Sequence, residues 1–189
     1  MGEMILYTER LILRPWEESD AESLYIYASD DRVGYPAGWP AHRNVEDSLE
    51  IIRTVLSDPN IYAVCRKGEN RAIGSVGLKT GRNTFLTDRA DEAEIGYWLG
   101  VPFWGRGYIP EAVRELQRHC FEDLKMRGLW CAYYEGNEKS RRVQEKSGFK
   151  YHHTMAGTEV SLLNEIRTEH VYYLSREEWE KNREVPYAQ

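Results

Sequence analysis

Apolar and polar residues alternate in several short segments of the chain, and this period of two is typical of half-buried β-strands. In the clearest segment, Ile95, Tyr97 and Leu99 share one face while Glu94 and Trp98 share the other. Similar segments lie at 9–16, 61–67, 71–79, 129–135, from about 149, and at 169–175. A short Gly-containing turn joins the second and third of these, which predicts an antiparallel hairpin.

Apolar residues spaced three and four positions apart predict helices between these strands. The expected helices begin after Ser19 or Asp20, run from Asn44 to Leu56, run from Pro110 to about Met126 with an end at Gly128, run from Asn137 to Gly148, and cover 176–182. The segment 31–43 is rich in Gly and Pro, so we expect a loop that presents Tyr35 and Trp39. The order of elements predicts a mixed sheet with helices on its faces, in an α/β (α+β) fold.

The length of 189 residues is most simply one domain, 1–189, with a full hydrophobic core. No apolar stretch approaches the roughly 20 residues that span a bilayer, and the first residues lack the features of a secretory signal. We therefore expect a cytoplasmic protein with no membrane partner. The net charge of -6 argues against general nucleic-acid binding and favours a cationic partner or substrate.

The three cysteines and five histidines give no metal-binding pattern. Cys65, Cys120 and Cys131 are odd in number, widely spaced and set in apolar surroundings. They are therefore expected to be buried free thiols, and no metal site is predicted.

The glycine pair at Gly105 and Gly107 lies between a strand and a helix, with Pro110 in the first helical turn. Glycines allow several N–H groups to converge, and a helix N-terminus adds partial positive charge, so a phosphate or pyrophosphate would fit here. A glycine pair that only turns the chain is the competing interpretation. A dinucleotide fingerprint needs a small residue where Pro110 stands, and no GKS or GKT follows for a P-loop.

A second block, NEKSRRVQEKSGF at 137–149, follows the glycine loop and its helix, with the predicted strand 129–135 in between. Taken with EIGYWLG at 94–100 and WGRGY at 104–108, it resembles the GCN5-related N-acetyltransferases (GNAT superfamily). TERLILRPW, GYPAGWP and YYLSREEW are similar to the branch that includes the ribosomal-protein N-terminal acetyltransferases, so the resemblance covers nearly the whole chain. It implies a mixed, mostly antiparallel central sheet of about seven strands with helices on both faces.

The resemblance also implies acetyl-CoA as the acetyl donor. Its pyrophosphate would be held by main-chain N–H groups of Gly105, Arg106, Gly107, Tyr108 and Ile109. The family's glutamine or arginine at the start of the loop is replaced by Trp104, and its small closing residue by Ile109, whose side chain must therefore point away from the cofactor.

The Glu94 strand and the next strand are expected to separate at one end, and we call this gap the splay. The pantetheine arm is expected there, against the main chain of Trp98 and Leu99. By resemblance, the Asn137 side chain helps to hold this arm, although it also suits a plain helix cap. Lys139, Arg141 and Arg142 form a basic cluster that suits either a CoA phosphate or a solvated helix face.

Acyl transfer to an amine needs a neutral amine and stabilisation of the departing thiolate. The resemblance implies Glu94 as a base acting through water, with an ordinary strand carboxylate as the alternative. The family's usual tyrosine acid corresponds to Gln144, which cannot supply a proton. Ser140 is the candidate that stabilises the thiolate, and Tyr134 is the alternative acid. Direct transfer without an acyl-enzyme is the simpler mechanism.

The expected acceptor is a primary amine, either a protein N-terminus or a polyamine, amino acid or aminoglycoside. Tyr35 and Trp39 are candidates to border its site, as are the acidic residues Asp88, Asp91 and Glu92. A CoA-binding regulatory or interaction module without turnover is the competing function, because Gln144 replaces the tyrosine. Pairing into a homodimer through a sheet edge or the final helix is left open.

Overall fold

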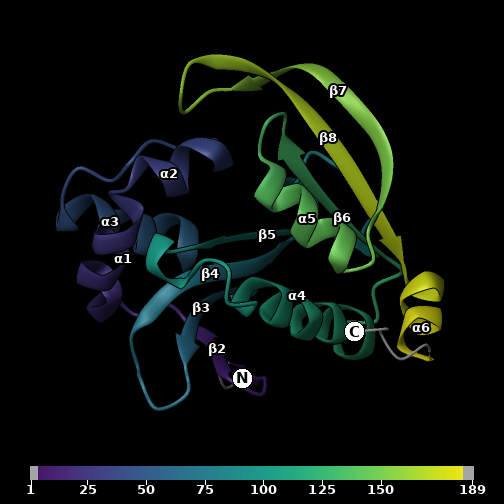
Figure 1. The fold of residues 1–189 in the computed structure, drawn as a ribbon, viewed down its shortest axis with the longest axis horizontal. Helices are drawn as coiled ribbons and strands as arrows, with labels where there is room; N and C mark the ends of the chain where they lie inside the picture. Colours follow the sequence, from purple (N-terminus) through teal and green to yellow (C-terminus); the bar gives the residue numbers. More distant parts are fainter. Residues whose placement is uncertain (1–3, 185–189) are drawn as a thin grey trace.

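The computed structural model describes residues 4–184, and one eight-stranded sheet runs through them (Figure 1). The strands follow the order β1-β2-β3-β4-β5-β6-β8-β7. Their bounds are β1 Leu6–Tyr7, β2 Leu11–Pro15, β3 Ile61–Arg66, β4 Ala72–Lys79, β5 Glu92–Leu99, β6 Gly128–Tyr134, β7 Lys150–Val160 and β8 Glu165–Ser175. The strand that sequence did not predict is β1, whose two residues are too few for an alternating pattern to be visible.

All neighbouring strands are antiparallel except β5 and β6, which run parallel. These two strands pair only over three residues each, from Glu92 opposite Gly128 to Glu94 opposite Trp130. Beyond Glu94 they separate, and the sheet opens between its two halves (Figure 1). The expected splay is therefore present, directly beyond the candidate base.

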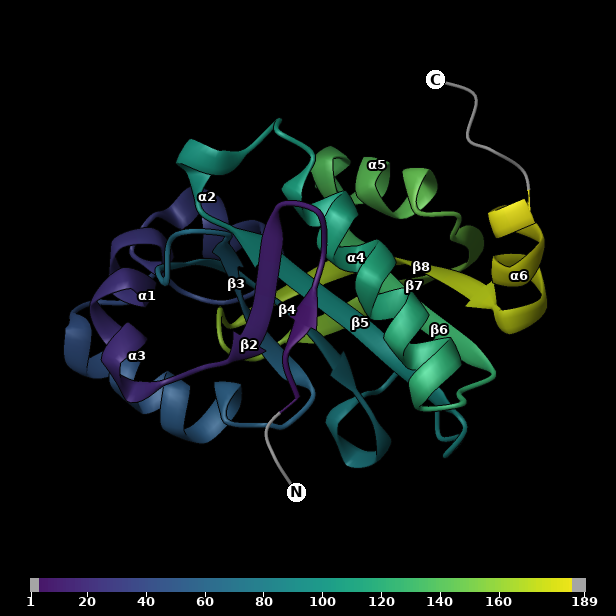
Figure 2. The same ribbon diagram turned by 90° about the horizontal axis from the view of Figure 1, so that it is seen from below.

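Helices cover both faces of the sheet, as expected (Figure 2). Helices α1 and α3 pack together on one face, and α4 and α5 lie on the other, with α5 beside β6. The helices are α1 Ala21–Ala28, α2 Asp31–Gly34, α3 Val45–Ile51, α4 Tyr108–Arg118, α5 Glu138–Lys146 and α6 Arg176–Glu184. The 3₁₀ turns are η1 Glu18–Asp20, η2 Tyr35–Ala37, η4 Gly81–Asn83 and η5 Val101–Phe103, and the π turns are η3 Ile52–Leu56 and η6 His119–Asp123.

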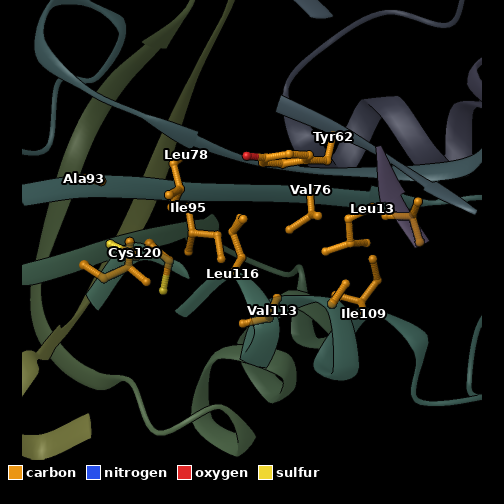
Figure 3. Packing of buried hydrophobic residues seen from close by; sticks show 14 of the residues in the cluster. Leu13, Tyr62, Val76, Leu78, Ala93, Ile95, Ile109, Val113, Leu116 and Cys120 are labelled. Atoms are coloured by element: carbon orange, nitrogen blue, oxygen red, sulfur yellow. The ribbon is translucent and has the colours of Figure 1, made fainter. Parts of the chain in front are cut away.

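Strand alternation divides the buried side chains between two hydrophobic clusters. In β3, Tyr62 and Val64 join the cluster under α4, while Ala63 and Cys65 join the cluster under α1 and α3. Figure 3 shows the first cluster, in which Ile95 and other strand residues pack against the buried face of α4. Burial of both sheet faces holds β5 in register beside the splay.

Helix α4 differs from the sequence prediction at both ends. It begins at Tyr108, so Pro110 occupies the first turn, where a missing N–H costs no intrahelical bond. Its α-helical part ends at Arg118 and a π turn continues to Asp123. The helix was expected to end at Gly128, but Lys125, with φ of 60°, takes the left-handed conformation after the π turn, and Gly128 instead opens β6.

The predicted caps were only partly right. Asn44 and Asn137 cap α3 and α5 through their side-chain oxygens, as expected. Asp20 makes no side-chain cap on α1 and instead forms a buried two-bond ion pair with Arg14, with both N–O distances 2.8 Å. The segment 31–43 is not simply a loop, because it contains the short helices α2 and η2.

The three cysteines are buried and free, which confirms the prediction from their surroundings. Within residues 4–184, the side chains that bind metals do not gather in any group of three or more. No helix in the same range is both long enough and apolar enough to cross a membrane.

Candidate active site

A groove of about 1980 Å³ crosses the sheet and passes through the splay between β5 and β6. On the α4 face it meets the glycine loop and α5, and on the opposite face it meets the loop after α2. The candidate site residues that line it are Glu94, Trp98, Leu99, Gly105, Gly107, Tyr108, Ile109, Asn137, Ser140 and Arg142. The structure therefore brings together all the candidate catalytic and cofactor-binding residues except Arg106, which does not line this groove.

The glycine loop has the geometry of an anion site. Gly105 and Gly107 have φ of 74° and 76°, in the left-handed region that favours glycine. Gly107 is the N-cap of α4 and makes no side-chain cap, so the first N–H groups of the helix are open to a ligand. A Cβ at Gly105 would meet nothing within 4 Å, which leaves space at the loop for a phosphate. The residues present thus fit a pyrophosphate.

Ile109 is 7% exposed and packs in the cluster beneath α4, where Figure 3 shows it beside the sheet. Its side chain therefore points away from the open side of the loop, as the cofactor hypothesis requires. The Arg106 carbonyl accepts a bond from the Arg10 guanidinium at 3.0 Å.

The turn between β1 and β2 clamps the glycine loop through Glu111. This carboxylate accepts bonds from the Arg10 amide at 2.8 Å, the Arg10 guanidinium at 2.7 Å and the Thr8 hydroxyl at 2.6 Å. Burial acts to raise the pKa of Glu111, but these bonds outweigh it and the pKa is lowered. The clamp thus keeps its charge at neutral pH. Sequence reasoning missed it because the partners lie about a hundred residues apart.

Strand alternation decides which main-chain groups of β5 face the splay. The Gly100 amide donates to the Ile73 carbonyl at 2.8 Å, and hydrogen-bonded pairs alternate along an antiparallel ladder. The main chain of Trp98 therefore turns toward β4, whereas that of Tyr97 and Leu99 turns toward the gap. The main-chain groups expected to be free at Trp98 and Leu99 thus lie at Tyr97 and at the Leu99 N–H, because the Leu99 carbonyl is taken by the Trp104 indole.

Two aromatic residues near the splay have defined partners. The Trp104 indole N–H donates to the Leu99 carbonyl at 2.7 Å, and the Lys139 ammonium lies 3.5 Å from the centre of the Trp104 ring. The Trp98 ring lies on the opposite face, 6.1 Å from both Trp16 and Trp39. Trp104 therefore replaces a polar family residue with an aromatic support for β5.

Ser140 lies in a polar cluster on the α4 face of the splay. Its Oγ is 2.9 Å from the Tyr97 hydroxyl and accepts from the Gln144 amide at 3.2 Å. Burial raises the pKa of Tyr97, which keeps this hydroxyl protonated. Either hydroxyl can donate in this contact, and the Tyr97 hydroxyl also lies 3.2 Å from the Ser140 carbonyl oxygen. When Tyr97 donates to Oγ, both lone pairs of Oγ are occupied and the Ser140 hydrogen is free to point into the groove. The arrangement suits donation to a developing anion.

Gln144 is 1% exposed and occupies the position of the family's tyrosine. Its amide nitrogen donates to the Ala132 carbonyl at 3.0 Å as well as to Ser140. Its Oε1 is buried and has no partner among the described residues. Gln144 thus acts on Ser140 and cannot itself be the acid.

Glu94 lies on the α1 face of the splay, with its side chain 15% exposed. One oxygen accepts from the Lys79 ammonium at 2.8 Å and the other from the Thr84 hydroxyl at 2.7 Å. Each carboxylate oxygen keeps a second lone pair, so the position can still bind a water. Sequence reasoning found Glu94 but neither partner.

The predicted acceptor residues fall into two groups. Tyr35 and Trp39 line the groove, together with Tyr134. Asp88, Asp91 and Glu92 are not among its lining residues. Glu92 is instead buried and accepts bonds from the Trp130 indole at 2.6 Å and the Thr87 hydroxyl at 2.7 Å, so it has a structural role.

Glu169 is a groove residue that sequence reasoning missed. It lies on β8 directly opposite Tyr134 of β6. Burial raises its pKa, and the charge of Glu94 raises it further while Lys79 opposes this. No local signal marks it, because a single glutamate that begins an alternating segment is an ordinary strand residue.

Comparison with known proteins identifies the fold and the family. A family model described as "Acetyltransferase (GNAT) domain" matches residues 10–150. A Bacillus subtilis protein named "Putative ribosomal N-acetyltransferase YdaF" is 38% identical over 180 residues, which cover 91% of this chain and 94% of that protein.

Two solved structures share the fold. A GNAT-family acetyltransferase from Bacillus anthracis has a TM-score of 0.80 and 23% identity, covering 92% of this chain and 99% of that one. The microcin C7 self-immunity acetyltransferase MccE, solved with acetyl-CoA and AMP, has a TM-score of 0.72 and 21% identity over 88% and 93% of the two chains. From the family match and its relatives, this chain is an acetyltransferase and belongs to the GNAT family.

Proposed function

We propose that the protein is an acetyl-CoA-dependent N-acetyltransferase that acetylates a primary amine by direct transfer in a ternary complex. The observation that carries this proposal is the single groove that passes through the β5–β6 splay. The glycine loop and Ser140 lie on one side of the sheet, and Glu94 lies on the other. A donor and an acceptor can therefore enter from opposite faces and meet between the strands.

Main-chain N–H groups from Gly105 to Ile109 would hold the pyrophosphate of acetyl-CoA, with Gly107 at the helix N-terminus. Asn137 and Arg142 line the same groove, where they would contact the pantetheine arm and a phosphate. Of the β5 residues, Tyr97 and Leu99 would present main-chain groups to this arm, because the main chain of Trp98 turns toward β4. When bound, acetyl-CoA supplies an acetyl group activated as a thioester.

Residues of this chain would meet two requirements of the reaction, the removal of a proton from the acceptor ammonium and the stabilisation of the leaving thiolate. Glu94 takes the proton of the acceptor ammonium through a water, for which its oxygens retain lone pairs. The amine nitrogen then attacks the acetyl carbonyl, the N–C bond forms, and the C–S bond breaks as CoA leaves as its thiolate. The second proton that the nitrogen loses passes through water to this thiolate. Ser140 donates its hydrogen bond to the sulfur as negative charge develops there. Tyr134 lies on the acceptor face, so Ser140 is the better-placed donor.

The acceptor is proposed to be a protein N-terminus or a small amine. The name of the Bacillus subtilis relative supports a ribosomal protein as one such substrate. The competing function is a CoA-binding module without turnover, and its support was the presence of Gln144 where the family has a tyrosine. The contact between Gln144 and Ser140 argues against that function, because it supports a replacement donor. The cytoplasmic location, the homodimer and the single domain stay predictions.

Acetyl-CoA consumption against a panel of amines tests the proposal, with Glu94→Gln and Ser140→Ala beside the wild type. We expect Glu94→Gln to lower kcat by roughly 10²-fold or more, the usual contribution of a general base, and Ser140→Ala to lower it by roughly tenfold. CoA affinity measured by calorimetry should stay unchanged in Glu94→Gln. Tight CoA binding with no turnover of any amine would favour the binding module instead.

A further inference from the structure

The cations that face the acceptor side of the groove already have carboxylate partners. Lys79 pairs with Glu94 at 2.8 Å. Arg167 makes two bonds to Glu165, at 2.6 and 2.8 Å, and a third to the Tyr35 carbonyl at 2.7 Å. The Arg167 charge is therefore matched, and its remaining contacts are with the rings of Tyr35 and Tyr134.

Glu169 is the carboxylate left over from these pairings. Across residues 4–184, its side chain has neither an ion-pair partner nor a hydrogen bond. It is nevertheless half-buried, and a half-buried carboxylate loses hydration that only a cation or a donor can replace. Among the described carboxylates that line the groove, Glu50 also lacks a partner but is exposed to water, so Glu169 is the half-buried one whose charge is unmatched.

The side chain of Glu169 shares the acceptor face with Tyr134. Directly opposed residues of an antiparallel pair project on the same side of a sheet, and Tyr134 is opposite Glu169. The Tyr134 hydroxyl would lie 3.2 Å from a Cβ at Gly38, so this side faces the loop after α2. Trp39 also lines the groove from this loop. Glu169 thus lies beside Tyr134 in the groove that Trp39 also lines, close enough to Glu94 to be affected by its charge.

We propose that Glu169 binds the ammonium group of the acceptor, and that the substrates are amines with no carboxylate next to the amine. This inference rests on the proposed function and names its substrate class. A half-buried carboxylate without a partner suits one ammonium ion. A free amino acid would bring its own carboxylate toward both Glu169 and Glu94, and like charges repel at such distances. An alkylamine, or the N-terminus of a peptide, brings no such charge.

Matched pairs of acceptors test the proposal: tyramine with tyrosine, agmatine with arginine, and alaninamide with alanine. We expect the wild type to favour the member without the carboxylate by at least tenfold in kcat/KM. In Glu169→Gln, KM for that member should rise about tenfold while kcat at saturation changes little, and the preference within each pair should shrink. Glu159→Gln, an exposed carboxylate on β7 outside the groove lining, is the matched control.

The pH profile provides a second readout. The groups that face Glu169 are Glu94 of β5, Lys79 of β4, Tyr134 of β6 and Arg167 of its own strand. Because the pKa of Glu169 is raised, it loses its charge at a higher pH than an ordinary glutamate as the solution is acidified. KM for the amine should therefore rise on acidification in the wild type, and this rise should be absent in Glu169→Gln.

The outcomes separate the two proposals. Amine turnover that keeps its KM and its pair preference in Glu169→Gln would overturn the assignment of Glu169 and leave the acetyltransferase reading intact. A wild-type preference for the amino acids would overturn the substrate class. Binding of CoA without turnover of any acceptor would overturn the proposed function, and this inference with it.

Discussion

At the scale of single residues, the orientation of Ser140 depends on Tyr97. The Tyr97 hydroxyl is 2.9 Å from the Ser140 Oγ and occupies one side of this oxygen. Without it, the Ser140 hydrogen can also turn to that side, away from the groove. We expect Tyr97→Phe to lower kcat by about fivefold, the value of one hydrogen bond of about 1 kcal/mol, with KM for acetyl-CoA little changed. Steady-state kinetics at saturating amine measure the effect.

The double variant Tyr97→Phe, Ser140→Ala is the control for this prediction. If Tyr97 acts through Ser140, the second substitution removes the effect of the first, and the two losses are not additive. A full additional loss in the double variant would show that Tyr97 acts by another route.

Residues whose role is local were the ones that sequence could predict. Asn44 and Asn137 cap their helices because a cap needs only the next three residues. Asp20 has the same local signature but is drawn to Arg14, which a neighbouring strand holds in the core. A buried guanidinium without a partner is costly, so this ion pair wins over the cap. The choice between the cap and the ion pair depends on tertiary packing, which cannot be read from a local sequence pattern.

At the scale of elements, the glycine loop permits a matched test. Gly105 and Gly68 have φ of 74° and 84°, and a Cβ at either would meet nothing within 4 Å. Alanine in the left-handed region costs roughly 1–2 kcal/mol at either position. Gly105→Ala and Gly68→Ala should therefore lose similar stability in urea unfolding. Only Gly105→Ala should weaken CoA binding, by roughly tenfold or more, the value of one hydrogen bond to a charged group.

Calorimetric titration with CoA gives the affinity of both variants. Equal CoA affinity in the two would contradict the role of Gly105 in the pyrophosphate site, because their backbone strain is alike. Gly68 lies in the turn between β3 and β4, away from the groove lining, so its variant reports the strain alone.

The order of the strands in the sheet could not be predicted from local sequence patterns. The chain returns β8 between β6 and β7, and this insertion sets Glu169 opposite Tyr134. Alternation along 169–175 predicts a strand there but not its neighbour. The resemblance to a family did predict the splay, and Glu94 was found for the same reason. The partners of Glu94 and of Ser140 required the structure, since they lie on other elements.

At the scale of the whole molecule, the β5–β6 contact is the strand pairing that joins the two halves of the sheet, and we call it the seam. Only three register pairs join the two halves of the sheet there. Side-chain bonds add to them, among them those of Arg167 to the Tyr35 carbonyl, Tyr97 with Ser140, and Trp130 to Glu92. A ligand that lies in the splay contacts both halves and stabilises the native state by mass action. We expect CoA at 100 times its Kd to add about 2.7 kcal/mol.

For a domain of this size, that free energy raises Tm by roughly 5–10 °C. Thermal unfolding with and without CoA measures the shift, and hydrogen exchange shows where the protection arises. Because the ligand would bridge the seam, amides of both β5 and β6 should gain protection together. Protection confined to the start of α4 would mean that CoA contacts only the glycine loop, and the donor half of the groove would then have to be placed outside the splay.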